Sequence, residues 1–286
     1  MFFLGLFIRF FSVVLQGFWY NIFVMNDNIP KRRFYKVKTM SEKIAPITEH
    51  LEELRRVMLI SLVSIFFASI LSYFLFLNTI KDILLEPIKK LGMNLVFLGV
   101  TEGIFIHIKL ALMGGIILAS PIVLWQLLKF FLPALHVHEK RVFVPAFFLA
   151  LFLFISGIFF AYKYALGLGL KVLLIDFSGG LTPMISISKY ISFIIAFLVP
   201  FGIVFEIPII TYFLTCLGLI TPQFLREKRG YVILGMFILA AVLSPGSDVI
   251  SQLLMAIPML ILYELSIIIS WLIYRKKEKE KEEAGL

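Results

Sequence analysis

The sequence predicts an all-α membrane protein whose chain crosses the lipid bilayer six times. Of its 286 residues, 60% are hydrophobic and only 16% are charged, whereas soluble domains are about half apolar and a quarter charged. The apolar residues also gather in long runs without charge, as expected of helices that satisfy their own backbone groups in lipid. These observations exclude a soluble enzyme, a disordered chain and a secreted disulfide-rich scaffold.

Four apolar runs are long enough to span a bilayer: residues 57–80, 110–128, 142–162 and 190 to about 218, the last interrupted only by Glu206. Two more follow at 231–243 and 250–274, separated by a turn at 244–248. A helix of residues 231–243 is about 20 Å long, less than the roughly 30 Å of a hydrocarbon core. We therefore expect short fifth and sixth helices that lie in a thinned bilayer or lean on their neighbours.

The basic residues predict the orientation of these spans. Leaving out Arg9, the regions on the side of the two flanks hold 19 Lys and Arg, and the regions on the opposite side hold 7. The positive-inside rule then places both termini in the cytoplasm, as a multi-pass protein of a bacterial-type plasma (inner) membrane. The loop around 81–109 fits this orientation least well, because it carries four lysines on the predicted outer side.

The chain divides into three parts. Residues 1–40 are an N-terminal extension, interpreted as a start-site artefact or an extra apolar segment; residues 10–25 followed by the basic run at 31–33 leave a seventh span as an alternative. Residues 41–274 form the six-helix membrane domain. Residues 275–286 form a charged cytoplasmic tail.

The sequence contains no motif typical of catalysis. It lacks a phosphate-binding loop ending in Gly-Lys-Ser/Thr, a His-Glu-x-x-His pair and a Gly-x-Ser-x-Gly turn. None of its four histidines has a ligand partner at metal spacing. We therefore expect no enzymatic activity, no cofactor and no metal, and we attribute the net charge of +9 to sidedness in the membrane rather than to nucleic-acid binding.

Two acidic residues beside the expected spans are candidate binding groups. Glu53 precedes the first span at helical spacing from Arg56, which is also ordinary for an amphipathic helix with weak salt bridges. Glu139 is the one acid in the loop at 129–141 and could pair with its basic neighbours. Together, the two acids could instead hold two guanidinium groups of a doubly basic peptide by charge-assisted hydrogen bonds.

Two further glutamates, Glu206 and Glu264, lie inside expected spans. An ionisable group in hydrocarbon costs about 2.5 kcal/mol or more, so it is functional, protonated or paired. Glu264 lies about 20 Å along its helix and is interpreted as reaching the cytoplasmic interface. Prolines in the spans favour a curved, partly open molecule, whose open face would expose Ser244 and Gln252 to a partner helix.

Six short motifs occur in one order between about residues 46 and 274. They are His50-Leu51-Glu52-Glu53-Leu54-Arg55, Ser120-Pro121 with Gln126, Pro133-Ala134-Leu135 to Glu139, Phe201-Gly202 to Phe205-Glu206-Ile207-Pro208, Ser244-Pro245 to Asp248 with Ser251-Gln252, and Ala256-Ile257-Pro258 to Tyr263-Glu264. With these motifs the chain resembles the TatC family, the multispanning receptor of the twin-arginine protein translocase. The resemblance covers roughly four fifths of the chain.

The resemblance implies a glove-shaped six-helix fold that binds the twin-arginine signal peptides of folded precursors at its cytoplasmic face. It also implies single-span TatA and TatB partners in a homo- or hetero-oligomer, and export driven by the proton-motive force. Several residues match family positions or lie beside them: Glu53 and Glu139 for the signal arginines, with His50, Leu54, Arg55, Gln126 and Phe130 around them; Glu206 and Glu264 as intramembrane polar groups; Ser244 and Gln252 for partner helices; Pro87 and Asp248 in the outer loops.

Two alternatives remain open. A secondary transporter or channel would use Glu206 as a proton or ion site between bent helices, and the purified protein alone would then carry substrate. A scaffold or insertase would bind nascent apolar segments without reading arginine. The N-terminal extension and an extra small residue in the turn at 245–248 depart from the family pattern.

Overall fold

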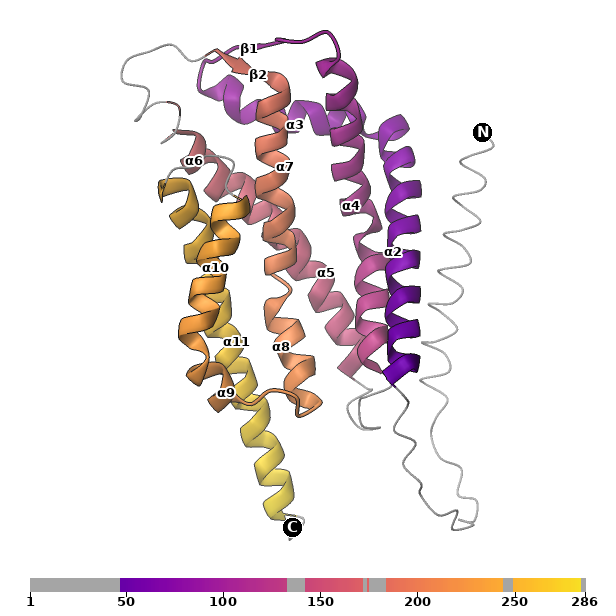
Figure 1. The fold of residues 1–286 in the computed structure, drawn as a ribbon, viewed down its shortest axis with the longest axis vertical. Coiled ribbons are helices and arrows are strands. Elements are labelled where there is room, and N and C mark those ends of the chain that lie inside the picture. The colour runs from indigo at the N-terminus through magenta and orange to yellow at the C-terminus, as the bar shows by residue number, and fades with distance from the viewer. Residues whose placement is uncertain (1–46, 133–141, 172–173, 175–183, 244–248, 284–286) are drawn as a thin grey trace.

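The computed structural model describes residues 47–132, 142–171, 174, 184–243 and 249–283. Most of the helices run along the long axis of the molecule, and one lies across its upper end (Figure 1). The elements in chain order are α2 (Ile47–Leu75), α3 (Leu77–Lys90), β1 (Leu95–Val96), α4 (Glu102–Phe131), α5 (Phe143–Phe160), the π-helix η3 (Ala161–Leu166), α6 (Gly167–Lys171), β2 (Ile185–Ser186), α7 (Ile187–Val204), α8 (Ile207–Cys216), α9 (Pro222–Glu227), α10 (Arg229–Leu243) and α11 (Val249–Glu283).

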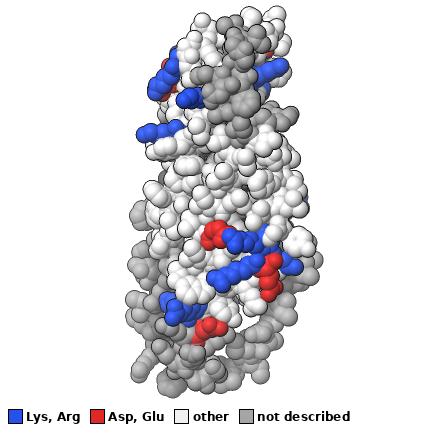
Figure 2. All heavy atoms as spheres, turned by 90° about the vertical axis from the view of Figure 1, so that its left-hand side faces the viewer, with Lys and Arg blue, Asp and Glu red and all other residues white. Residues whose placement is uncertain are grey.

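The all-α class predicted from the sequence is confirmed. In the described part of the chain, five stretches are long and apolar enough to cross a membrane: Glu52–Leu75, Glu102–Phe131, Phe143–Lys171, Ile187–Cys216 and Gln252–Glu278. The remaining expected span is the shorter apolar helix α10, whose apolar part is Arg229–Val242. Figure 2 shows a broad uncharged surface between charged side chains at two levels, as expected of a protein with an apolar belt.

Two expected spans differ from the predicted continuous helices. The first run does not continue to residue 80, because α2 ends at Leu75 and α3 begins at Leu77 and lies across the end of the molecule (Figure 1). The fourth run is broken between Val204 and Ile207 into α7 and α8. Pro208, in the first turn of α8, lacks the backbone N–H that would continue the preceding helix.

The sixth helix is not short, contrary to the expectation from apolar length. Helix α11 has 35 residues and continues through the charged stretch after residue 274 as far as Glu283. Lysines and glutamates are good helix formers that support one another at i,i+4 spacing, so the tail residues extend the helix. Of the two helices that were expected to be short, only α10 is, with 15 residues.

Helix α2 packs mainly on α4, and only 17% of the residues in its apolar window are buried. The contact is close because α4 carries glycines where the helices meet. A Cβ atom added at Gly115 would lie 2.6 Å from the Cα atom of Ser69, and one at Gly114 would overlap the side chain of Ser72. Small residues of this kind let two helix backbones approach in a membrane.

The other helices share two apolar clusters. One joins α3, α4, α6, α7, α10 and α11 around Ile191, Phe197 and Met255, all fully buried. The other joins the last turns of α4 to α5 and α8, where Trp125 packs edge-on against Phe143 at 4.9 Å between ring centroids. The sequence analysis did not expect the two-residue parallel pair β1–β2, which ties the loop before α4 to the start of α7.

Candidate functional site

A pocket of about 320 Å³ lies between α2 and α4, at the end of the molecule where α2 begins and α4 ends (Figure 1). Its walls come from one face of each helix and from the residue after α4. The lining residues are Glu53, Arg56, Val57, Ile60, Gln126, Lys129, Phe130 and Leu132.

Helical periodicity explains why these residues meet. On α2, residues 53, 56, 57 and 60 follow the i, i+3, i+4, i+7 pattern of one helix face. On α4, residues 126, 129 and 130 repeat that pattern. The close approach of the two helices at Gly115 holds the two faces beside each other. The pocket therefore depends on a helix contact that lies farther along the pair.

The described lining carries one carboxylate, Glu53, and two cations, Arg56 and Lys129. Gln126 adds an amide that can both donate and accept hydrogen bonds. Phe130 and Leu132 add apolar surface beside these polar groups. The lining is thus amphipathic, with a carboxylate at its edge that can accept bidentate hydrogen bonds from a guanidinium.

Three of the residues assigned to one site from the sequence line this pocket: Glu53, Gln126 and Phe130. Leu54 and Arg55 are exposed on α2 and do not line it. His50 lies in the first turn of α2, but its side chain is outside the described residues, as is Glu139 in the segment between α4 and α5.

Arg56 and Lys129 also line the pocket, although the sequence pattern indicated only a salt-bridge partner for the first and a loop charge for the second. Both lie three residues from a predicted site residue, at Glu53 and Gln126. That spacing on a helix was the signal that would have found them.

Glu206 lies at the break between α7 and α8. Its side chain is only 4% exposed, and its Oε1 atom has no hydrogen-bond partner among the described residues. Its backbone carbonyl accepts bonds from the N–H groups of Ile209 and Ile210 in the first turn of α8. The backbone of Glu206 therefore begins α8, while its carboxyl group is buried.

Glu264 has a different environment. Its Oε1 atom lies 2.6 Å from the guanidinium of Arg229 at the start of α10, and both side chains are about half exposed. The ion pair supports the interpretation that Glu264 lies near a polar interface. The two glutamates assigned together from the sequence therefore differ in both burial and pairing.

Gln252 and Pro87 have structural contacts. The Gln252 amide donates to the Phe237 carbonyl at 2.9 Å and so joins α11 to α10. Pro87 lies inside α3 next to Glu86, whose pKa is lowered by a hydrogen bond and charge attraction from Lys90 at 2.7 Å. Ser244 and Asp248, the other residues assigned to partner docking and to the outer loops, lie outside the described residues.

Comparisons with known proteins agree with the resemblance to the TatC family. Residues 49–258 match the family model described as TatC, Sec-independent protein translocase protein. The protein of that name from Carboxydothermus hydrogenoformans is 46% identical over 239 residues, covering 83% of this chain and 98% of that protein. The one from Escherichia coli K12 is 35% identical over 245 residues, covering 85% of this chain and 94% of its own length.

A solved structure is also similar. A crystal structure of the twin arginine translocase receptor TatC superposes with a TM-score of 0.72 at 42% sequence identity. The match covers 78% of this chain and 98% of that one.

Proposed function

The chain belongs to the TatC family of Sec-independent protein translocase proteins, and we propose that it is the receptor that binds twin-arginine signal peptides of folded precursors at the cytoplasmic face. It is a transport protein of the membrane. The observation that carries the proposal is the pocket between α2 and α4, where Glu53, Gln126 and Phe130 meet. A signal peptide offers both guanidinium groups and apolar residues to such a lining.

The charges of the pocket explain why a second acid is needed. Glu53 shares the lining with Arg56 and Lys129. Without a peptide, the described lining thus has one carboxylate and two cations. Two incoming arginines add two more positive charges. Glu139, in the segment that directly follows Leu132 of the lining, supplies the second carboxylate in this proposal. Each acid then holds one guanidinium by charge-assisted hydrogen bonds.

The position of the pocket fits a cytoplasmic site. Helix α2 begins and α11 ends at the same end of the molecule as the pocket (Figure 1). The excess of basic residues, 19 against 7, assigns that end to the cytoplasm. The protein then crosses the inner membrane six times, with both flanks inside and α10 as its short fifth span.

The remaining family properties complete the proposal. TatA and TatB-type single-span proteins dock near Ser244, which follows α10 in the sequence, and Gln252 in α11, and the proton-motive force drives export. Helix α10, with 15 residues, is about 22 Å long, shorter than a hydrocarbon core of about 30 Å. Thinning of the bilayer beside it would lower the barrier to passage of a precursor.

Binding of a twin-arginine signal peptide to the detergent-solubilised full chain tests the receptor function. We expect Glu53→Ala and Glu139→Ala each to weaken binding roughly 10- to 100-fold, because a hydrogen bond to a charged group contributes about 1.5–3 kcal/mol. A peptide with both arginines replaced by lysine is expected to bind equally weakly to wild type, since lysine keeps the charge and loses the bidentate geometry. Fluorescence anisotropy of a labelled peptide measures all of these affinities.

Glu52→Ala is the matched control. Glu52 is exposed, precedes Glu53 directly and does not line the pocket. It removes the same charge from the same helix turn, so wild-type binding in this variant shows that position, and not net charge, determines affinity. Equal affinity of all variants and of the lysine peptide would overturn the proposal. Flux of an ion or solute through the purified protein in vesicles, abolished by Glu206→Gln, would favour a transporter instead.

A further inference from the structure

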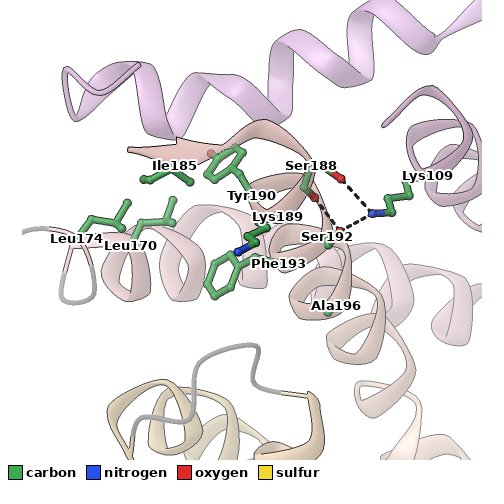
Figure 3. Close-up of a pocket in the computed structure, with 10 residues that line it drawn as sticks. All are labelled: Lys109, Leu170, Leu174, Ile185, Ser188, Lys189, Tyr190, Ser192, Phe193 and Ala196. Carbon is green, nitrogen blue, oxygen red and sulfur yellow. Dashed lines mark hydrogen bonds between the residues drawn. The ribbon is translucent and has the colours of Figure 1, made fainter. Parts of the chain in front are cut away.

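A second pocket, of about 610 Å³, lies at the other end of the molecule (Figure 3). It is formed where the start of α7 faces α4 and α6. Two lysines contribute to its lining, Lys109 from α4 and Lys189 from α7. Figure 3 shows Lys109 beside Ser188 and Ser192, and Lys189 beside Phe193. The family motifs of the sequence analysis include none of these residues.

Lys109 is held in place by serine hydroxyls. Its Nζ atom donates to Ser192 Oγ at 2.7 Å and to Ser188 Oγ at 3.4 Å (Figure 3). The Ser192 hydroxyl in turn donates to the Ser188 carbonyl at 2.7 Å, so its lone pairs face the lysine. An ammonium has three donors, and these contacts use two of them. One N–H remains for an acceptor in the pocket.

No carboxylate balances these cations within the described lining. The acid nearest along α4, Glu102, accepts from Ser186 Oγ at 3.0 Å and from the Leu98 N–H at 3.2 Å. Lys109 lies seven residues into α4, about 10 Å from the first turn, and thus near the boundary between headgroups and hydrocarbon. A cation at that depth without a counter-charge among the described residues is costly, so Lys109 favours an anion in the pocket.

The rest of the lining is apolar. Leu170 and Leu174 face Ile185 and Phe193 across the pocket (Figure 3), and Ala196 continues this surface along α7 toward the middle of the span. A soluble anion would use the lysines and leave this surface unused. A ligand with a negative head and an apolar chain would use both.

We propose that this pocket binds an anionic phospholipid. The phosphate lies between Lys109 and Lys189, with the Ser188 hydroxyl as a further donor, and an acyl chain follows the apolar surface along α7. Basic pockets between transmembrane helices hold acidic headgroups in this way. The site is independent of the signal-peptide pocket, since the two lie at opposite ends of α4.

Native mass spectrometry of the full chain, released from detergent in the presence of phosphatidylglycerol or phosphatidylcholine, tests this site. Wild type is expected to bind phosphatidylglycerol more tightly. Lys109→Gln and Lys189→Gln should each weaken that binding about fivefold, and the double variant roughly 30-fold, given the contribution of each lysine near a lipid surface. A variant with arginine at both positions keeps the charge and should keep the preference, while showing that the site tolerates substitution.

Lys89→Gln is the matched control, because Lys89 is an exposed lysine of α3 outside the pocket. It removes one charge and should leave lipid binding unchanged. Equal phosphatidylglycerol binding by wild type and the double variant would overturn the proposal. Displacement of the lipid by millimolar inorganic phosphate would also overturn it, in favour of a soluble anion.

Discussion

The first and the last helix of the described chain, α2 and α11, are joined to their neighbours by different means. Helix α2 is held to α4 by a close backbone approach at Gly114 and Gly115. Helix α11 is held to its neighbours by polar side chains: Thr215 Oγ1 donates to Ser270 Oγ at 2.9 Å, Tyr263 donates to the Leu225 carbonyl at 2.7 Å, and Arg229 pairs with Glu264.

Both ways of joining the helices follow from the lipid that surrounds them. Lipid provides little hydrophobic drive between helices, so association depends on van der Waals packing or on interhelical hydrogen bonds. The close packing of α2 and α4 depends on the absence of side-chain atoms and is sensitive to any addition. The polar interactions of α11 are several and lie apart from one another, so each one contributes only a small part of the free energy that holds the helix in place. We therefore expect single substitutions to have large effects in the first region and small ones in the second.

The largest effect is expected for Gly115→Ala. The new Cβ atom would lie 2.6 Å from a backbone atom of Ser69, so α2 must move away and the Glu53 pocket opens. Overpacking of this kind costs about 1–3 kcal/mol. Taken out of peptide binding at 1.4 kcal/mol per factor of ten, that cost lowers signal-peptide affinity by about 5- to 150-fold. SDS-titration unfolding and peptide anisotropy measure the two effects.

Gly235→Ala is its control. Gly235 lies in α10 with open space around it, so the same substitution there should stabilise by up to about 1 kcal/mol through helix propensity. If both variants behaved alike, the close approach of α2 and α4 would not be what holds the pair.

A smaller effect is expected for Tyr263→Phe, which removes the bond from the Tyr263 hydroxyl to the Leu225 carbonyl. A net loss of about 1 kcal/mol is expected for one buried hydrogen bond. Tyr73→Phe makes the same change on α2, where the tyrosine ring lies edge-on to Phe74 and His107 and is 44% exposed, and should be neutral in the same unfolding titration. A destabilising Tyr73→Phe with a neutral Tyr263→Phe would reverse the comparison.

Thr215→Val should cost about 0.6 kcal/mol, the average for an interhelical hydrogen bond in a membrane. Combination with Ser270→Ala gives a double-mutant cycle for the contact between α8 and α11. The coupling energy should match the single loss. A coupling energy of zero would mean that packing alone holds these two helices.

The smallest effect is expected for the Arg229–Glu264 pair, because its side chains are 55% and 43% exposed. A cycle with Arg229→Gln and Glu264→Gln should give a coupling energy of about 0.3 kcal/mol that decreases with added salt. A coupling energy above about 2 kcal/mol, independent of salt, would place the pair inside the membrane and away from its interface.

Much of the fold could be predicted from the lengths of the apolar runs, because every turn of a helix that is exposed to lipid must carry apolar residues. The run at 110–128 lies within α4, and the run at 142–162 lies within α5 and η3 except for its first residue, Val142. The break at Phe76 could not be predicted in the same way, since it lies inside uninterrupted apolar sequence. The break at Phe205 has a local signal in Glu206 and Pro208, but apolar length alone does not register it.

The candidate site was predicted only in part. Glu53, Gln126 and Phe130 lie together in the pocket between α2 and α4, and their motifs in the sequence singled them out. Lys109 was counted among the lysines of the loop at 81–109, and Lys189 was not singled out, because a count of basic residues does not show which groups a lysine faces. Their convergence depends on how α4 packs against α7, which periodicity along one helix does not specify.

The π-helix η3 after α5 changes the phase of that span. One extra residue in the turn Ala161–Leu166 rotates everything after it by about 100° relative to a regular helix. Residues before the turn therefore face α4 and α7, while those of α6 face α11, so one continuous span serves two sets of neighbours. In an alignment of relatives, a one-residue gap in this turn would carry a geometric meaning: it would turn Leu170 away from the lysine pocket without altering a single lining residue.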